Sequence, residues 1–273
     1  NGVDNRVVTA TSATALNGEA NLNYNGTRLG VGASGSGADL GVGIHVRSAD
    51  SGGTVSTDAD ELVLENSGNA GITFLSGASD SARIFFGDSG SPAIGWIRYF
   101  HNTNTMDFGT NEANALVIDS TGRVTKPLQP AFMSLNGGGT TLANATDVTI
   151  TLDTEIFDIG SNISGNTFTA PITGKYYFSG SVVADAGAGN NTRFEESHIY
   201  INCSNRKLKF GEEQHYTNIN DWWAMSVSGL IDMDANDTCT LTYFGRRQSG
   251  SGTCVSVGSS TDFRTGLSGY LVA

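Results

Sequence analysis

The sequence predicts an all-β protein, from three observations about its composition and pattern. Glycine supplies 36 of the 273 residues, about 13% where ~7% is usual. Lys, Glu and Leu, which propagate helices, are few, whereas Gly, Ser, Thr and Asn, which mark turns, recur throughout. Apolar residues come in short runs that alternate with polar ones, as in half-buried strands. The glycines follow no G-X-Y period and 9% of the residues are aromatic, which excludes collagen and disordered acidic tails.

The first 125 residues predict short strands separated by polar turns. The strands recur about every ten residues, the spacing of a β-meander or β-solenoid. They are expected at Gly43–Arg47, Glu61–Glu65, Gly71–Leu75, Ala82–Phe86, Ile94–Phe100 and Leu116–Asp119.

Neither face of these strands is cleanly polar. In Ile94–Phe100 one face carries Trp96 and the other carries Ile97 and Tyr99, so a single sheet of this kind cannot bury itself. We therefore expect three copies of the chain to wrap a common axis, each supplying one wall of a β-prism, which also covers the exposed sheet edges. A monomeric β-solenoid is the alternative.

Residues 126–130 predict a linker, because two of the four prolines lie within this stretch and restrict it to extended backbone. We expect a shaft of short repeated strands over residues 1–125 and a head domain over residues 131–273. The head is long enough to bury its own core. Its predicted strands are longer and alternate regularly, and eight or so antiparallel strands indicate a sandwich or jelly roll. The clearest are Tyr176–Val183, Ser197–Cys203, Trp223–Ile231 and Thr238–Phe244.

Three strings of the head, at residues 157–160, 166–178 and 266–272, closely resemble the globular-head domain of complement component q. The most specific is F-T-A-P-x-x-G-x-Y-x-F at residues 168–178. The resemblance covers about residues 130–273 and implies a ten-strand-type jelly roll of the tumour-necrosis-factor kind. It also implies a homotrimer with an apolar axis, since members of that family are trimers. The fold-defining residues that it marks are Phe157, Gly160, Phe168, Pro171, Gly174, Tyr176, Phe178 and Gly269.

The chemistry of these residues agrees with such a fold. Pro171 suits the end of a strand, Gly174 permits a turn, and Tyr176 and Phe178 lie two residues apart, on one strand face that we expect to be the core.

The first domain resembles, less specifically, the repeating shaft of phage tail fibres and other virion fibres. The strings that carry this resemblance lie at residues 59–66, 84–88, 94–99 and 116–124, and residues 16–22 are similar to segments that precede such shafts. The chain departs from one common arrangement of the family. No recognisable self-cleaving chaperone domain follows the shaft, and the jelly roll takes its place.

Charge and hydropathy limit the kinds of partner that the protein can have. With 15 basic and 27 acidic residues the net charge is −12, and adjacent basic residues occur only at Arg206-Lys207 and Arg246-Arg247, so no nucleic-acid partner is expected. No apolar run approaches the ~20 residues that span a bilayer, and no signal peptide is recognisable, so no membrane insertion is expected. Because the chain starts at Asn1 in mid-pattern, we expect a missing N-terminal region that joins other virion proteins.

The three cysteines, Cys203, Cys239 and Cys254, do not form a disulfide framework. If the strands around Cys239 and Cys254 form a hairpin across the Gly245–Gly252 turn, these two cysteines lie opposite each other and can pair. The more ordinary interpretation is that all three are small buried residues in a reducing compartment.

One protease-like string is present and is not interpreted as catalytic. Gly87–Pro92 differs by one residue from the G-D-S-G-G-P around the nucleophile of trypsin-like proteases. A triad needs a His and an Asp from an earlier β-barrel, yet only His45 precedes Ser89. A tight turn between two shaft strands is expected instead.

Acidic loops of the head are the candidate binding site. Alternating strands predict that loops 185–191, 234–237 and 259–262 meet at the tip of the head, where they touch a host cell-surface glycan or protein. The candidate residues are Asp185, Asn190, Asn191, Asp234, Asn236, Asp237, Thr261 and Asp262. The segment 232–237 has the carboxylate spacing of a calcium loop without the glycine and glutamate of an EF-hand. Calcium at Asp234 and Asp237 and simple solvated turns are both left open, and no other cofactor is expected.

The histidines and the tryptophan pair each allow a structural and a functional interpretation. The four histidines, His45, His101, His198 and His215, show no metal-ligand spacing and are expected to be ordinary strand and loop residues. Trp222 and Trp223 point to opposite faces of one strand, so one is expected in the core and the other at the surface or at an interface. A surface tryptophan suits packing between subunits or stacking on a sugar.

We therefore expect a structural and recognition protein rather than an enzyme. It would be the distal part of a homotrimeric virion fibre that attaches to the host cell surface, located in the virion or at an extracellular surface. Two alternatives remain: a spike enzyme that depolymerises polysaccharide, with a site assembled from distant residues, and a cellular trimeric adhesin or lectin-like protein with the same head.

Overall fold

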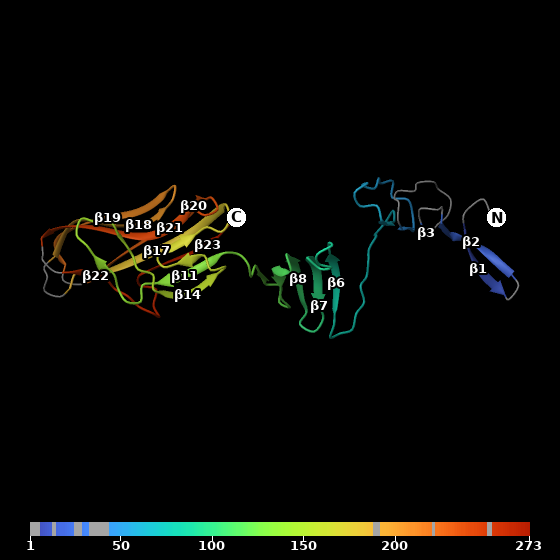
Figure 1. The fold of residues 1–273 in the computed structure, drawn as a ribbon, viewed down its shortest axis with the longest axis horizontal. Coiled ribbons are helices and arrows are strands. Elements are labelled where there is room, and N and C mark those ends of the chain that lie inside the picture. The colour runs from blue at the N-terminus through green and yellow to red at the C-terminus, as the bar shows by residue number, and fades with distance from the viewer. Residues whose placement is uncertain are drawn as a thin grey trace. The chain divides into compact units, whose positions relative to one another are not determined.

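The computed structural model of the chain describes residues 6–12, 15–24, 29–32, 44–187, 192–219, 222–249 and 253–273. Every regular element in these ranges is a β-strand, which confirms the all-β class (Figure 1). No helix in the described ranges has the length and apolar character needed to cross a membrane. The chain divides into two compact units, Asn1–Leu75 and Ser76–Ala273.

The first unit carries a five-stranded sheet in the order β1-β2-β3-β4-β5. Strands β1 to β3 are antiparallel, whereas β3, β4 and β5 are parallel. Their bounds are Arg6–Ser12 (β1), Ala15–Tyr24 (β2), Leu29–Gly32 (β3), Ile44–Arg47 (β4) and Leu62–Glu65 (β5).

One predicted strand of this unit is wrong. Gly71–Leu75 forms no strand, and the side chains of Ile72, Phe74 and Leu75 are 56%, 49% and 91% exposed. Alternation of apolar residues describes the faces that a strand would have, but a strand forms only where a neighbour accepts its hydrogen bonds.

The second unit begins with a single-layer antiparallel sheet, in which β6 to β10 follow one another as a meander. Of the meander and the solenoid that the strand spacing allowed, this stretch forms the meander. Within the described chain these strands pair only with one another, and the linker predicted at residues 126–130 follows β10. The bounds are Ser81–Phe86 (β6), Gly95–Phe100 (β7), Thr105–Thr110 (β8), Ala113–Ile118 (β9) and Val124–Thr125 (β10).

Two facing sheets follow and form a jelly-roll-like head (Figure 1). One, which we call the inner sheet, has the order β12-β22-β17-β23-β11-β14, with β20 on the other side of β17. The other, the outer sheet, has the order β15-β16-β21-β18-β19, with β13 also paired to β21. The inner-sheet strands are Ala131–Leu135 (β11), Thr141–Leu142 (β12), Thr154–Ile159 (β14), Gly174–Asp185 (β17), Trp222–Met233 (β20), Cys254–Ser256 (β22) and Gly266–Leu271 (β23). The outer-sheet strands are Val148–Thr149 (β13), Ile163–Ser164 (β15), Thr167–Thr169 (β16), Thr192–Cys203 (β18), Lys207–Ile219 (β19) and Thr238–Ser249 (β21).

Aromatic side chains fill the space between the two sheets. Tyr176 and Phe178 are fully buried, as predicted from their shared strand face. Phe168 of the facing sheet stacks on Phe132, with the ring centroids 4.8 Å apart, and meets Phe178 edge to face at 5.5 Å. Offset and edge-to-face pairs of this kind add to the burial of apolar area that holds the sheets together.

The three fold-defining glycines, Gly160, Gly174 and Gly269, have different roles: two allow close packing and one adopts a turn conformation. A Cβ on Gly269 would lie 2.6 Å from Phe178, and one on Gly174 would lie 2.7 Å from the carbonyl oxygen of Ala273. Gly174 therefore allows the C-terminal residues to approach β17 closely. The sequence had suggested instead that this glycine permits a turn. Gly160 does adopt a left-handed backbone, with φ of 95°. Phe157, in contrast, is 43% exposed on β14 and lies outside the core.

The head has two distinct ends. At one, which we call the terminal end, the backbone N–H of Lys175 donates to Ala273 and that of Leu271 donates to Pro130. The opposite end, which we call the far end, lies where β17 finishes at Asp185 and β20 begins at Trp222, since these two residues pair. The strand β17 separates the ends by roughly 36 Å, at ~3.3 Å per residue.

Candidate functional site

Of the three predicted tip loops, one lies at the opposite end of the head from the other two. Asp185 lies at the far end, and the loop that contains Thr261 and Asp262 is held against the same half of β17, where Ser181 Oγ donates to the carbonyl of Arg264 at 2.9 Å. The 234–237 turn instead follows Met233, which pairs with Gly174 at the terminal end. The expectation that all three loops share one tip is therefore wrong. Asn190 and Asn191 lie outside the described residues.

A missed strand explains this error. The strands expected from the sequence include none between Cys203 and Trp223, where the segment Lys207–Ile219 is rich in charged and polar residues. The structure has β19 there, paired with β18 along the sheet edge. Each additional antiparallel strand reverses the direction of the chain, so β20 runs opposite to the expected direction and delivers Asp234 to the terminal end.

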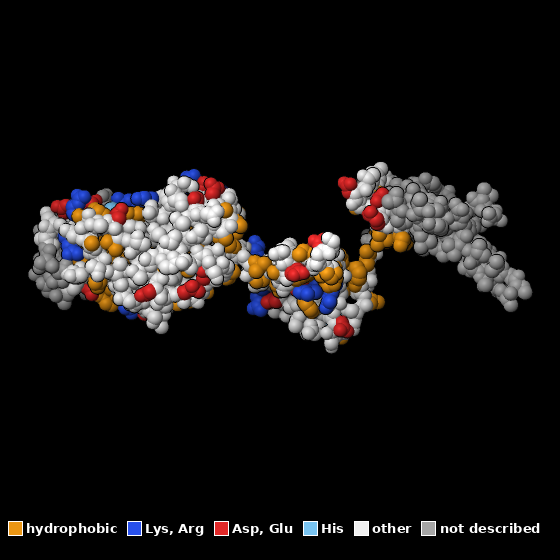
Figure 2. All heavy atoms as spheres, viewed as in Figure 1, with side chains coloured by type: hydrophobic (Ala, Val, Ile, Leu, Met, Phe, Trp, Pro, Cys, Tyr) orange, Lys and Arg blue, Asp and Glu red, His pale blue; other side chains and the backbone are white. Residues whose placement is uncertain are grey.

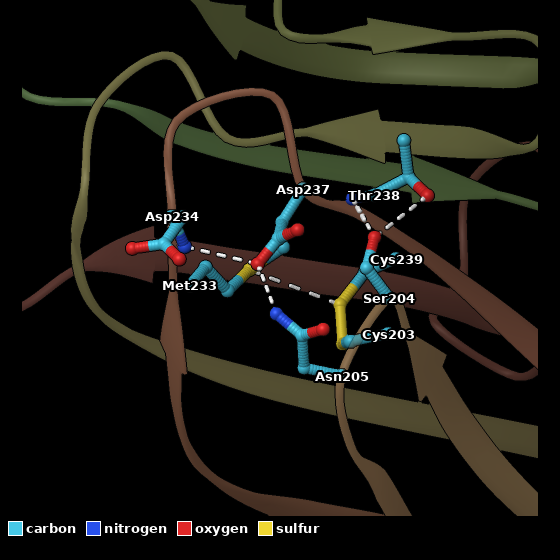
Figure 3. Close-up of a disulfide and its surroundings, with 8 residues drawn as sticks. All are labelled: Cys203, Ser204, Asn205, Met233, Asp234, Asp237, Thr238 and Cys239. Carbon is cyan, nitrogen blue, oxygen red and sulfur yellow. Dashed lines mark hydrogen bonds between the residues drawn. A yellow bond between two sulfur atoms is a disulfide. The ribbon is translucent and has the colours of Figure 1, made fainter.

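The carboxylates of the 234–237 turn stabilise the turn itself. Asp237 Oδ2 accepts the backbone N–H of Asp234 at 2.9 Å and the Asn205 side-chain amide at 3.0 Å (Figure 3). Asn236 has φ of 74°, a left-handed conformation that Asn tolerates well. Within the described chain no three Asp, Glu, His or Cys side chains are grouped closely enough to hold a metal ion. The hydrogen bonds of Asp237 fit the solvated-turn alternative, in which the carboxylate organises backbone.

The disulfide lies beside this turn and joins different cysteines from those considered. Cys203 at the end of β18 is bonded to Cys239 of β21, with Cα atoms 4.1 Å apart, and the two strands pair at these residues (Figure 3). Cys254 is a buried free thiol in β22, whose neighbours are β12 and β17. The hairpin considered as one alternative for Cys239 and Cys254 does not form, because β21 and β22 belong to opposite sheets. The interpretation of three reduced thiols holds only for Cys254.

The far end presents an aromatic side chain beside an ion pair. Trp223 is buried in the core, while Trp222 is 51% exposed on the opposite face of β20, as the sequence predicts for adjacent tryptophans. The guanidinium of Arg264 lies 5.5 Å from the centroid of the Trp222 ring. Arg264 Nη2 donates to Asp262 Oδ2 at 3.1 Å. Sequence reasoning named Asp262 but missed Arg264, because only the tertiary fold brings this loop to β20.

The exposed face of the inner sheet carries an apolar row near the terminal end. Leu230, Tyr177 and Tyr270 are directly paired across β20, β17 and β23, and the two tyrosine rings lie 5.6 Å apart. The row continues through Ala131 to Ile159 of β14. Leu230 is 59% exposed and Tyr270 is 49% exposed. Contiguous exposed apolar side chains of this kind mark interaction surfaces.

On one face of the single-layer sheet, the side chains cover one another. Arg98 donates to both carboxylate oxygens of Asp107, at 3.0 and 2.8 Å. Its guanidinium also lies 4.7 Å from the Trp96 ring and 4.5 Å from the Phe100 ring. Asp107 is consequently only 2% exposed and Trp96 9% exposed. Cation–π contacts and a two-point ion pair thus stabilise this face within one chain.

The opposite face, which we call the apolar face, has no such cover from the residues that the structure describes. Paired residues of antiparallel strands share a face, and here the pairing aligns two apolar rows across β6 to β9. Ile84 and Phe108 are 41% and 37% exposed. Hydrophobic side chains accordingly reach the surface of this part of the chain (Figure 2). The rows are Ile84, Ile97, Phe108 and Leu116, and then Ala82, Tyr99, Met106 and Ile118.

The protease-like string forms a turn between β6 and β7, as expected. Asp88 Oδ1 accepts the backbone N–H groups of Gly90 and Ser91, at 2.7 and 2.9 Å. These bonds lower the pKa of Asp88, with Ser91 as the largest cause. A Cβ on Gly87 would lie 2.7 Å from the carbonyl oxygen of Pro92. The residues therefore form a tight turn that Asp88 stabilises.

Three histidines make contacts that fit ordinary structural roles. His45 Nε2 lies 2.9 Å from Glu65 Oε2, which links β4 to β5. His101 meets the ring of Tyr99 edge to face at 5.1 Å. His198 stacks on Phe244 with the ring centroids 5.0 Å apart. Only the backbone of His215, in β19, is described.

Comparison with solved structures finds similar folds for about half of the chain. The globular domain of zebrafish complement 1qA protein is 14% identical, with a TM-score of 0.37, over 53% of this chain and 98% of that chain. Murine APRIL at pH 8.5 is 10% identical, with a TM-score of 0.34, over 53% and 99%. The PRD1 vertex protein P5 is 9% identical, with a TM-score of 0.36, over 54% and 99%. No family model and no curated protein sequence matches the chain.

Proposed function

We propose that this protein is a structural and recognition component of a virion fibre, such as a phage tail fibre. Three copies of the chain assemble in parallel, the sheets of β6 to β10 form part of the shaft, and the jelly-roll heads attach to the host cell surface. No catalytic step is part of this function.

The observation that carries the proposal is the uncovered apolar face of the single-layer sheet. A single-layer sheet leaves the side chains of its apolar face in water unless that face packs on another surface, and burying them is favourable. Further copies of the same chain can supply that surface. Neither of the two rows of the apolar face contains a charged residue. Copies of the chain can therefore pack against each other through these rows without burying an unpaired charge.

A second surface supports the same assembly. The row Leu230, Tyr177, Tyr270, Ala131 and Ile159 gives the head an apolar band of its own. Tyrosines at such a surface bury large apolar area and keep a hydroxyl for hydrogen bonding. Two such bands on one chain favour a homotrimer that is held along its length.

The mass in solution tests the proposal. Light scattering should give three times 28.5 kDa for the wild-type chain. Adding Ile97→Asp and Tyr270→Asp together should shift the mass toward a single chain, because both substitutions place a charge in an apolar contact. Asn102→Asp adds the same charge in an exposed turn and should leave the mass unchanged. A wild-type mass near 28.5 kDa contradicts the proposal.

A separate assay addresses catalysis. Incubation of the protein with purified capsule or lipopolysaccharide should release no new reducing ends. Released oligosaccharide would replace the recognition function by that of a depolymerising spike.

A further inference from the structure

We propose that Trp222, Arg264 and Asp262 form a subsite at the far end of the head that binds one neutral sugar ring of a surface glycan. This inference rests on the recognition function proposed above and gives it a ligand class and specific residues.

In the single chain the three side chains are accessible together, and Trp222 lies on the same face of β20 as Leu230, at the other end of the strand. Trp222 is 51% exposed, at the start of β20. The side chains of Arg264 and Asp262 are 41% and 59% exposed and are joined to each other at 3.1 Å. The guanidinium of Arg264 also lies over the indole ring, 5.5 Å from its centroid, so a sugar would stack on the part of the half-exposed ring that this contact leaves accessible. An aromatic surface, a hydrogen-bond donor and an acceptor are therefore presented within one small area.

The loop that carries the ion pair is held in place before any ligand arrives. Ser259 Oγ accepts the backbone N–H groups of Thr261 and Asp262, at 3.2 and 2.9 Å. The backbone N–H of Arg264 donates to the carbonyl of Asp262 at 2.8 Å. Ser181 of β17 then donates to the carbonyl of Arg264 at 2.9 Å. A site ordered in advance loses little conformational entropy on binding.

This set of groups matches the chemistry of a sugar ring. The C–H groups on one face of a pyranose are apolar and stack on an indole, whereas its hydroxyls need both donors and acceptors. Asp262 supplies carboxylate oxygens and Arg264 supplies fixed N–H donors, so adjacent hydroxyls can bond to both residues. Three side chains are enough for one ring, whereas a protein interface occupies some 20–30 residues a side.

Charge selects neutral sugars over acidic ones. The chain has a net charge of −12, and Asp185 is paired with Trp222 across β17 and β20. An anionic polymer would be repelled by the protein as a whole. A single neutral sugar would bind weakly, and repetition of the subsite in a trimer would raise the apparent affinity without new contacts.

Binding of simple sugars to the intact protein tests the inference. The probes are the methyl glycosides of glucose, galactose, mannose and N-acetylglucosamine, with sialyllactose as the anionic comparison, measured by saturation-transfer NMR and on surfaces that display the sugars multivalently. We expect at least one neutral sugar to bind. Trp222→Ala should weaken it tenfold or more, Trp222→Phe less, and Arg264→Ala several-fold.

The matched control is Arg206→Ala. Arg206 forms an exposed ion pair with Asp232, at 2.8 Å, at the terminal end of the head, and its loss should change sugar binding less than twofold. The molar mass of each variant in solution is also measured by light scattering. Absence of binding by every neutral sugar, unchanged binding by Trp222→Ala, or a changed mass of Trp222→Ala would each overturn the subsite. A trimeric wild type that binds no sugar removes only this inference, whereas a monomeric wild type removes the proposed assembly.

Discussion

Cys203 and Cys239 show how much stability a single covalent link gives to the head. Their disulfide joins β18 to β21 across a sequence separation of 36 residues. A cross-link of that span restricts the unfolded chain and contributes about 3–4 kcal/mol in the loop-entropy description. The buried Cys254 contributes only through packing, and burial raises the pKa of its thiol.

Replacing both bonded cysteines should reveal this contribution. We expect Cys203→Ala with Cys239→Ala to lower the free energy of unfolding by about 3–4 kcal/mol in urea without reductant. Dithiothreitol should lower the stability of the wild type and leave the double variant unchanged. Cys254→Ala serves as the control, since its effect should be the same with and without reductant. Equal wild-type stability in both conditions would show that the link is absent.

Gly269 tests how tightly the aromatic core is packed. A methyl group there would meet Phe178 at 2.6 Å and Phe132 at 3.0 Å, and both rings are buried. Gly269→Ala should therefore lower the free energy of unfolding of the head by ~1–3 kcal/mol through overpacking. Chemical denaturation followed by near-ultraviolet circular dichroism measures the loss. Gly71→Ala, where a Cβ meets nothing within 4 Å, should stay within ~0.5 kcal/mol of wild type.

Asp119 gives the single-layer sheet a pH dependence. Its carboxylate accepts from the hydroxyl of Thr121 at 2.7 Å and from Arg123 Nε at 2.6 Å. These bonds hold the pKa of Asp119 well below its usual value of 3.8, with the Thr121 hydroxyl as the largest cause. A depressed pKa in the folded state means that the stabilisation is present above pH ~4 and is lost as the pH falls further.

The variant Asp119→Asn isolates this effect. Above pH 5 it should melt at a lower temperature than wild type, because the ion pair with Arg123 is gone. The difference should shrink as the pH is lowered from 4 to 2, because the Asp119 carboxylate of the unfolded wild-type chain takes up a proton over this range while that of the folded chain stays ionised. Thermal melts by far-ultraviolet circular dichroism follow the change. A difference that is constant over this range would show that the charge of Asp119 has no part in it.

At the scale of elements, the Arg98–Asp107 pair stabilises β7 against β8. Asp107 is 2% exposed, so removing one partner leaves the other charge without its counterion in a poorly hydrated place. Asp107→Ala should cost roughly 3–5 kcal/mol, whereas Arg98→Met with Asp107→Leu should cost less, because no charge remains. Hydrogen exchange of the amides in β7 and β8 is the measurement. Equal protection in the single and double variants would contradict this role.

Strand prediction succeeded where side chains themselves carry the signal. Alternation in Tyr176–Val183 and Trp223–Ile231 identified β17 and β20. It placed Tyr176 correctly in the core and predicted that one of Trp222 and Trp223 is buried, which is Trp223. It failed for β19, because the polar composition of this edge strand hides its pairing with β18. It also failed for Gly71–Leu75, which has the alternation but forms no strand. Pairing is a property of two segments, and no local pattern contains it.

At the scale of the whole molecule, the linker predicted at residues 126–130 has an observable consequence. Leu128 is 56% exposed. The stretch forms a turn, in which the backbone N–H of Gln129 donates to the carbonyl of Lys126 at 3.0 Å, and not the extended backbone that its two prolines suggested. Limited proteolysis with thermolysin should yield a resistant head fragment that starts between residues 127 and 131. Mass spectrometry identifies the first residue of the fragment. Cleavage confined to the junction of the two compact units, at residues 75 and 76, would place the domain boundary there instead.

The sequence by itself determined the fold class, several strands of the meander and of the head, and the burial of Tyr176 and Phe178. These depend on local quantities: turn residues, period-two alternation and the close spacing of Tyr176 and Phe178. Only the tertiary structure decided that Cys203 bonds to Cys239, that Asp234 lies at the opposite end from Asp185, and that Arg264 reaches Trp222. Each depends on strand order and direction, which arise from hydrogen bonds between segments far apart in the chain. One unrecognised strand reverses every direction after it, and this is why the loops of the head could not be placed from the sequence.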